Sequence, residues 1–138
     1  MRMTRKDPVT PDVYESVIAR DKFQRWLRLL FLYSIDPRED MKGSMDMWRE
    51  ARKSFCVAQT VDPLGSGPCS GRITLDHVHL HAGGTKGKRA PSDERHLVSL
   101  CEGHHLVSRA GHIWATANRP MLREYLLTIY GEGHDGQP

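Results

Sequence analysis

Histidine and cysteine are concentrated in one stretch of this chain, and this feature constrains the fold more than any other. Seven of the eight histidines lie between positions 77 and 112. Within that stretch Cys101 and His104 are three residues apart, close enough on one helical turn to share a metal ion. Three cysteines and one histidine form a ligand set typical of structural zinc. The predicted ligands are Cys56, Cys69, Cys101 and His104. The alternative is three free, buried cysteines, which are common in cytosolic proteins.

The composition limits the class of protein. A chain of 138 residues corresponds to about one domain, and at 38% hydrophobic it can bury one modest core. The net charge of +3 permits a nucleic-acid partner without requiring one. No signal peptide is visible, and the most apolar run, residues 26–33, is too short to span a membrane. We therefore expect a cytoplasmic protein with no membrane partner.

The pattern of apolar residues predicts an α+β fold in which helices dominate. One long helix or two shorter ones are expected over residues 11–34. Further helices are expected over residues 44–55, 102–111 and 118–131, and strands over residues 73–81 and 96–100. Thr10 and Ser44 are the expected N-caps of the first two helices. Residues 56–71 read as a loop that zinc would tether, and residues 132–138 as a disordered tail.

A second group of candidate ligands lies beside the first. His105 is rotated by about 100° from His104 on a helix, so it faces a different neighbourhood. Asp76 and His77 offer a hard oxygen ligand beside an imidazole. A carboxylate and a histidine holding a cation, with another histidine to accept a proton from water, suit phosphodiester hydrolysis. On an ideal strand Asp76 and His77 point to opposite faces, so one site uses both only if the strand twists or bulges. Otherwise His79 becomes a rival ligand.

Taken in order, these residues resemble the HNH endonuclease family, with its ββα-metal (His-Me) finger. The matching segments are Leu75-Asp76-His77-Val78, Gly83-Gly84 and the run from His96 to His105. The resemblance covers residues 56–112 and extends loosely to Val17-Ile18-Ala19-Arg20-Asp21 upstream and to Ala115-Thr116-Ala117-Asn118-Arg119 downstream. Small HNH nucleases of bacteriophages and prophages are the most similar. The resemblance implies a single domain in the cytoplasm of a bacterial host cell, with a zinc-bearing finger flanked by an N-terminal helical region, residues 11–55, and a C-terminal helix.

The resemblance also implies roles for individual residues. Asp76 and His105 would hold a catalytic Mg²⁺ or Mn²⁺, distinct from the structural zinc, and His77 would be the general base. His96 stands where the family has its central asparagine, so it would orient the base or join the metal shell. Residues 22–55 look like a helical insertion relative to the family.

Basic residues in and beside the glycine-rich loop are candidate DNA contacts. They are Lys86, Lys88, Arg89 and Arg95. In a nuclease they would grip phosphates next to the cut, and the alternative is a flexible basic surface loop. His81 and His112 are interpreted as loop histidines, although His112 could supplement the metal.

Three functions follow from these features. The leading hypothesis is a metal-dependent DNA endonuclease or nickase. The second is a zinc-stapled DNA-binding module that no longer cuts. The third is a protein-interaction domain built on the N-terminal helices, which exposed apolar residues among residues 26–33 would support. Some phage HNH nucleases act beside the packaging terminase and others are homing elements, and the residues choose neither. A monomer with one site would nick, whereas a double-strand break needs two sites or two visits.

Overall fold

A computed structural model of the chain describes residues 7–80 and 90–131. Its helices are α1 (Pro11–Leu32), α2 (Met41–Lys53), α3 (Val57–Val61), α4 (Glu102–His105), α5 (Trp114–Ala117) and α6 (Arg119–Tyr130), with a 3₁₀ turn η1 (Glu94–His96). Its strands are β1 (Ile73–His77), β2 (Leu97–Cys101), β3 (Ser108–Arg109) and β4 (His112–Ile113). The predicted α+β class is confirmed. His81, Gly83-Gly84, three of the candidate DNA contacts (Lys86, Lys88, Arg89) and the predicted tail lie outside the described residues.

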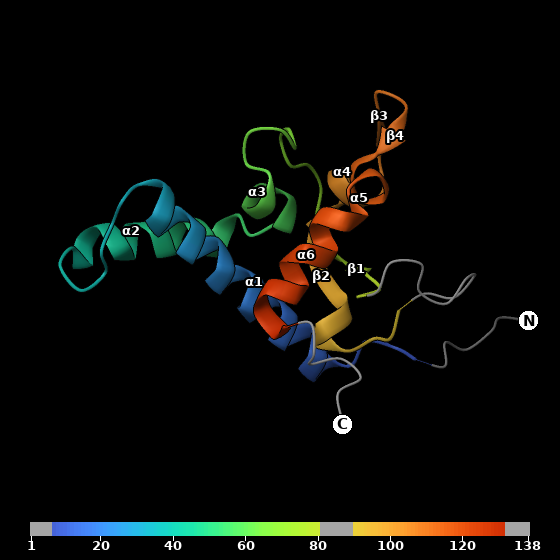
Figure 1. Cartoon of the computed structure of the whole chain (residues 1–138), viewed down its shortest axis with the longest axis horizontal. Coiled ribbons are helices and arrows are strands. Elements are labelled where there is room, and N and C mark those ends of the chain that lie inside the picture. The colour runs from blue at the N-terminus through green and yellow to red at the C-terminus, as the bar shows by residue number, and fades with distance from the viewer. Residues whose placement is uncertain (1–6, 81–89, 132–138) are drawn as a thin grey trace, which may run out of the picture.

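An antiparallel pair, β1 and β2, forms the centre of the fold. Ile73 lies opposite Cys101 and His77 opposite Leu97, and the register between these pairs is continuous, without a bulge. All five residues of β2 are buried. Core side chains from β2, α3 and α6 pack together, and α6 crosses in front of the strands (Figure 1).

The edge of β2 that does not face β1 is covered by two charged side chains of α1. The backbone N–H of Ser99 donates to Asp21 Oδ2 at 2.8 Å, and Arg20 Nη2 donates to the Leu97 carbonyl at 2.6 Å. Asp21 also accepts a 2.5 Å hydrogen bond from the Tyr125 hydroxyl of α6. Because these backbone groups would otherwise be buried without partners, the Arg20–Asp21 pair stabilises the strand and joins it to both long helices.

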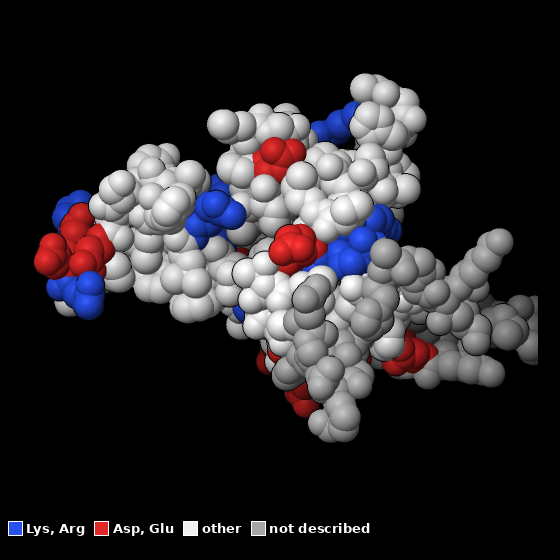
Figure 2. Space-filling model, in the orientation of Figure 1, with Lys and Arg blue, Asp and Glu red and all other residues white. Residues whose placement is uncertain are grey.

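The C-terminal half of α1 and the whole of α2 form a helical arm that projects from the strands (Figure 1). Trp26 holds the two helices together, because its indole N–H donates to the Ser44 carbonyl at 2.9 Å and its ring meets Trp48 edge-on at 6.0 Å. Acidic and basic side chains lie together at the far end of the arm (Figure 2), where Asp46 pairs with both Lys42 and Arg49.

Several element boundaries differ from the sequence prediction. Ser44 is not the N-cap of α2, because Asp40 takes that position and accepts a 2.9 Å hydrogen bond from the Gly43 N–H. The predicted loop 56–71 contains α3, and α5 precedes α6. The helix expected to reach Gly111 ends at His105 and is followed by the β3–β4 hairpin. Ala110 and Gly111 both have positive φ, which suits a two-residue hairpin turn and not a helix.

The first helix was predicted closely. It begins at Pro11, and the Thr10 hydroxyl accepts a hydrogen bond from the Val13 N–H, as an N-cap does. In the part of the chain that the structure describes, no helix has both the length and the apolar character needed to cross a membrane.

Candidate metal centres

Four side chains that are distant in sequence meet beside the end of β2. The cluster comprises Cys56, Cys69, Cys101 and His104, whose ligand atoms all lie within 4.8 Å of one another. The His104 Nδ1 atom lies 3.7 Å from the sulfurs of Cys56 and Cys69 and 3.0 Å from that of Cys101. Tetrahedral zinc, with ligands at about 2.0–2.3 Å, separates a sulfur from a nitrogen by about 3.6 Å. The predicted set is therefore brought together with dimensions that could hold a zinc ion.

A hydrogen bond on the side of the His104 ring away from the sulfurs determines which ring nitrogen carries the proton. His104 Nε2 lies 2.8 Å from the Ser66 carbonyl oxygen, which can only accept. Nε2 therefore carries the proton, and the Nδ1 lone pair points at the three thiols. This is the arrangement that a metal-binding histidine requires, since its outer N–H is normally held by a carbonyl or carboxylate.

The loop that carries Cys69 is fastened on both sides of that residue. Arg109 of β3 donates to the Pro68 carbonyl at 3.0 Å and to the Ser70 hydroxyl at 2.9 Å. Gly103 allows this close approach, because a Cβ there would lie 2.3 Å from the Ser70 hydroxyl oxygen and 2.4 Å from the Arg109 guanidinium. The sequence analysis did not identify Arg109, and no local pattern marks it.

The thiols differ in acidity. A hydrogen bond from Cys56 lowers the pKa of Cys69 to about 5, with further contributions from Cys101 and His104 that together outweigh burial. The same Cys56–Cys69 bond, together with burial, raises the pKa of Cys56. Because the thiolate is the form that binds metal, Cys69 offers this form more readily than Cys56 does.

Asp76 and His105 form the second candidate centre. Asp76 Oδ1 lies 3.3 Å from His105 Nε2, and the Asp76 carboxylate is almost fully buried. Thr74 holds the other ring nitrogen, with its hydroxyl oxygen 2.6 Å from His105 Nδ1. That hydroxyl donates to the Leu100 carbonyl at 2.8 Å, so in neutral His105 the proton lies on Nδ1. The Nε2 lone pair then faces a carboxylate oxygen. This arrangement is favourable only if a cation lies between the two atoms, and that cation can be a proton or a metal ion.

A third side chain reaches the same carboxylate from α6. Arg119 Nη1 donates to Asp76 Oδ2 and lies 3.3 Å from the His77 carbonyl oxygen. Burial would raise the pKa of Asp76, but the hydrogen bonds from His105 and Arg119 and the charge of Arg119 outweigh burial, so the pKa is lowered. Asp76 is therefore kept ionised, and Arg119 occupies one of its two oxygens.

His77 lies on the other side of the strand. Since β1 has no bulge, successive side chains alternate, and the ring of His77 leaves the face opposite Asp76. His77 Nε2 lies 2.9 Å from the Ser92 hydroxyl, which itself donates to the Asp7 carbonyl at 2.6 Å. His77 lines a hollow of about 450 Å³ together with Leu75 and five residues around the start of α1, namely Val9, Thr10, Pro11, Tyr14 and Glu15. A bulge that would let Asp76 and His77 share one site is therefore absent from β1.

The remaining candidate residues lie apart from these centres or have other contacts. His96 is buried at the start of β2, with Nδ1 2.7 Å from Asp93 Oδ1. The backbone carbonyl of His79 accepts a 3.1 Å hydrogen bond from Arg123 Nε. His112 is exposed on β4, and Arg95 is half-buried in η1. Roles for His77, His79, His96 and Arg95 stay predictions.

Comparison with known proteins adds no family to these observations. No protein-family model matches the chain, and neither a curated protein nor a solved structure matches it.

Proposed function

We propose that this protein is a metal-dependent DNA endonuclease or nickase with a ββα-metal finger, in which zinc holds the Cys56–Cys69–Cys101–His104 cluster. The observation that carries the proposal is the closeness of two potential ligand atoms, Asp76 Oδ1 and His105 Nε2, which lie 3.3 Å apart. Two neighbouring ligands of an octahedral Mg²⁺ ion lie about 3.0 Å apart, so the pair matches the donor set and spacing for such an ion. The order of elements, an antiparallel strand pair followed directly by α4 carrying His105, agrees with the resemblance in the sequence.

The side chains around the pair have defined tasks under this proposal. Asp76 and His105 would hold Mg²⁺ or Mn²⁺, which when bound neutralises the scissile phosphate and the leaving oxygen. Thr74 fixes the His105 ring so that Nε2 faces the ion, and Arg119, which donates to the other Asp76 oxygen, keeps the carboxylate ionised. Structural zinc would keep α4, and with it His105, against the strands.

His77 remains the proposed general base. The Ser92 hydroxyl donates a hydrogen bond to the Asp7 carbonyl, so it accepts one from His77 Nε2. The neutral His77 ring therefore has its proton on Nε2 and its lone pair on Nδ1. Because His77 and Asp76 lie on opposite faces, a phosphate served by both must lie across the end of β1. Lys86, Lys88, Arg89 and Arg95 are proposed to contact the neighbouring phosphates.

Two observations favour the second candidate, a zinc-stapled DNA-binding module that does not cut. Arg119 already neutralises Asp76, and the ring of His77 is on the other face of β1. In such a module Arg119 would take the place of the cation, and DNA binding would not depend on Mg²⁺ or Mn²⁺.

Plasmid cleavage separates the two candidates. Supercoiled plasmid is incubated with the wild type and with Asp76→Asn, His105→Ala and His77→Ala, in Mg²⁺, Mn²⁺ or chelator. His112→Ala serves as the control, because that histidine is exposed on β4. The nuclease proposal expects metal-dependent nicking by the wild type and His112→Ala, and a loss of at least about 100-fold in the other three, all folded by circular dichroism. DNA binding without cutting in any metal would establish the module instead, and persistent cutting by folded His77→Ala would transfer the base role to His79 or His96.

A further inference from the structure

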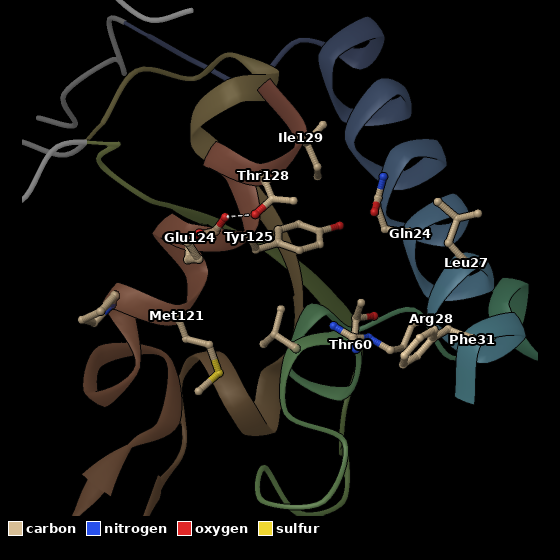
Figure 3. A pocket seen from close by; sticks show the side chains of 12 residues that line it. Gln24, Leu27, Arg28, Phe31, Thr60, Met121, Glu124, Tyr125, Thr128 and Ile129 are labelled. Atoms are coloured by element: carbon tan, nitrogen blue, oxygen red, sulfur yellow. Dashed lines mark hydrogen bonds between the residues drawn. The ribbon is translucent and has the colours of Figure 1, made fainter. Parts of the chain in front are cut away.

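A large hollow in the described part of the molecule lies away from both candidate metal centres. It is a groove of about 760 Å³ between α1 and α6, with α3 at its floor. Gln24, Leu27, Arg28 and Phe31 line it on the α1 side, Met121, Glu124, Tyr125, Thr128 and Ile129 line it on the α6 side, and Thr60 lies between them (Figure 3). Neither metal centre contributes a residue to this groove, so the proposed chemistry does not explain it.

The α1 wall of the groove bears an apolar stripe that has no cover within the described chain. Leu27 and Phe31 are four residues apart, so they lie along one side of the helix, and both line the groove. Their exposed fractions are 40% and 75%, and Tyr33 just beyond them is 66% exposed. Large apolar side chains exposed together on one helix mark an interaction surface more often than chance exposure does. Exposed apolar side chains among residues 26–33 are the feature expected of a protein-interaction domain built on the N-terminal helices.

The two walls of the groove carry opposite charges. Arg28 is exposed on α1 and Glu124 is exposed on α6, and neither side chain forms an ion pair with another described residue. This face of the molecule is self-complementary, because it carries an exposed apolar stripe, a groove and two opposite charges. If two copies are related by a two-fold axis, α1 of each copy enters the groove of the other, and Arg28 of each copy meets Glu124 of the other. Such an isologous contact closes as a dimer and does not propagate into a filament.

We propose that the groove between α1 and α6 is a homodimer interface, in which Phe31 of one copy fills the groove of the second copy. The interface has the pattern of a helix lying in a groove, with an aromatic anchor at the centre and a charged pair at the rim. It requires neither metal nor DNA. Where the nuclease proposal also holds, a dimer brings two cutting sites to one DNA molecule, which is one of the two routes to a double-strand break.

Sedimentation velocity over a concentration series tests the interface directly, without metal or DNA. The wild type is expected to dimerise reversibly. Phe31→Asp is expected to weaken association by about 100-fold, because each dimer contains the contact twice. Leu64→Asp is the matched control, since Leu64 is an apolar side chain that is 99% exposed in a loop outside the groove, and it should associate like the wild type.

Charge reversal distinguishes this interface from other ways of pairing. Arg28→Glu and Glu124→Arg should each weaken self-association by about tenfold or more, because like charges then face each other. An equimolar mixture of the two variants should dimerise as well as the wild type, since each chain then presents the charge that the other lacks. A monomeric wild type, or single variants that mixing does not rescue although both are folded, would overturn the proposal. Plasmid cleavage by a protein that stays monomeric would overturn the dimer alone, and a dimer without cleavage would overturn the nuclease alone.

Discussion

The imidazole of His104 is held from behind by the backbone of Ser66, at 2.8 Å from Nε2 to the carbonyl oxygen. The carbonyl fixes the proton on that nitrogen and turns the Nδ1 lone pair toward three sulfur atoms. Ser66 belongs to the loop that also carries Cys69. The contact therefore links the conformation of this loop to the orientation and protonation of the His104 ring. A buried histidine placed in this way among thiols has few uses other than metal binding.

Zinc removal should therefore unfold the region around the cluster. We expect one zinc ion per chain by elemental analysis and a large fall in melting temperature in a strong chelator. Cys56→Ser should lose the ion and more than about 4 kcal/mol of the free energy of unfolding, as loss of a structural metal does. His112→Ala, a surface histidine on β4, should keep both. A metal-free wild type that melts at the same temperature with and without chelator would show that the thiols are simply buried.

The Arg20–Asp21 pair should be the most sensitive charged position outside the metal centres. Asp21 is fully buried and accepts from Ser99, Tyr125 and Arg20, so Asp21→Asn leaves a buried guanidinium without its counter-charge. We expect a loss of about 3–5 kcal/mol in urea unfolding. Asp36→Asn is the control, because Asp36 also pairs with an arginine, Arg38, but at the surface. The control should unfold as the wild type does. Equal stability of the two variants would mean that the edge of β2 does not need the pair.

Tyr125 should make the fold sensitive to alkaline pH. Burial, followed by the negative charge of Asp21, raises the pKa of Tyr125 well above its ordinary value near 10. Between that value and the raised one the unfolded chain loses a proton that the folded chain keeps, so stability is full below about pH 10 and falls as the pH rises. Tyr125→Phe should flatten the decline in the free energy of unfolding above pH 10. Tyr14→Phe, at an exposed position, should leave the decline unchanged.

The sequence revealed the residues of the candidate zinc site but not the contacts that bring them together. Cysteine and histidine are rare enough for their pattern to be informative, and all four predicted ligands meet. The separation between Cys56 and Cys69 is bridged by α3 and a loop held by Arg109, which is an ordinary surface residue in the sequence. Arginine is common and its partners are backbone carbonyls, so no spacing rule could identify it.

The second centre shows where local reasoning stops. Strand alternation correctly indicates that Asp76 and His77 face opposite ways. The approach of Arg119 to Asp76 depends on how α6 packs over the strands, which is a tertiary fact with no local signature. Ser44 was mistaken for an N-cap because Asp40, four residues earlier, is an equally good one and the spacing of apolar residues did not decide between them.

The turn after α1 contains a residue that can be improved. Ser34 has φ of 55°, the left-handed region in which a side chain is unfavourable and glycine is preferred after a helix. Ser34→Gly should therefore raise the free energy of unfolding by about 0.5–1 kcal/mol. Ser54→Gly, after α2, has an extended φ of −136° and should give no gain. Chemical denaturation of both variants measures the difference, and a destabilised Ser34→Gly would show that the serine side chain has a role in the turn.

Binding of Mn²⁺ should depend on Asp76 and His105 and should be separable from zinc. Asp76 Oδ1 and His105 Nε2 lie 3.3 Å apart, so a divalent ion that takes the place of a proton between them gains two ligands. In zinc-loaded protein we expect one Mn²⁺ site by electron paramagnetic resonance, weakened at least about tenfold in His105→Ala, in line with the loss of a direct ligand. Arg119→Gln should strengthen it, because the arginine competes for the same carboxylate. Zinc content should stay at one ion per chain in both variants, which separates loss of the second site from unfolding. If Arg119→Gln instead binds Mn²⁺ more weakly, the arginine positions Asp76 for the ion and does not replace it.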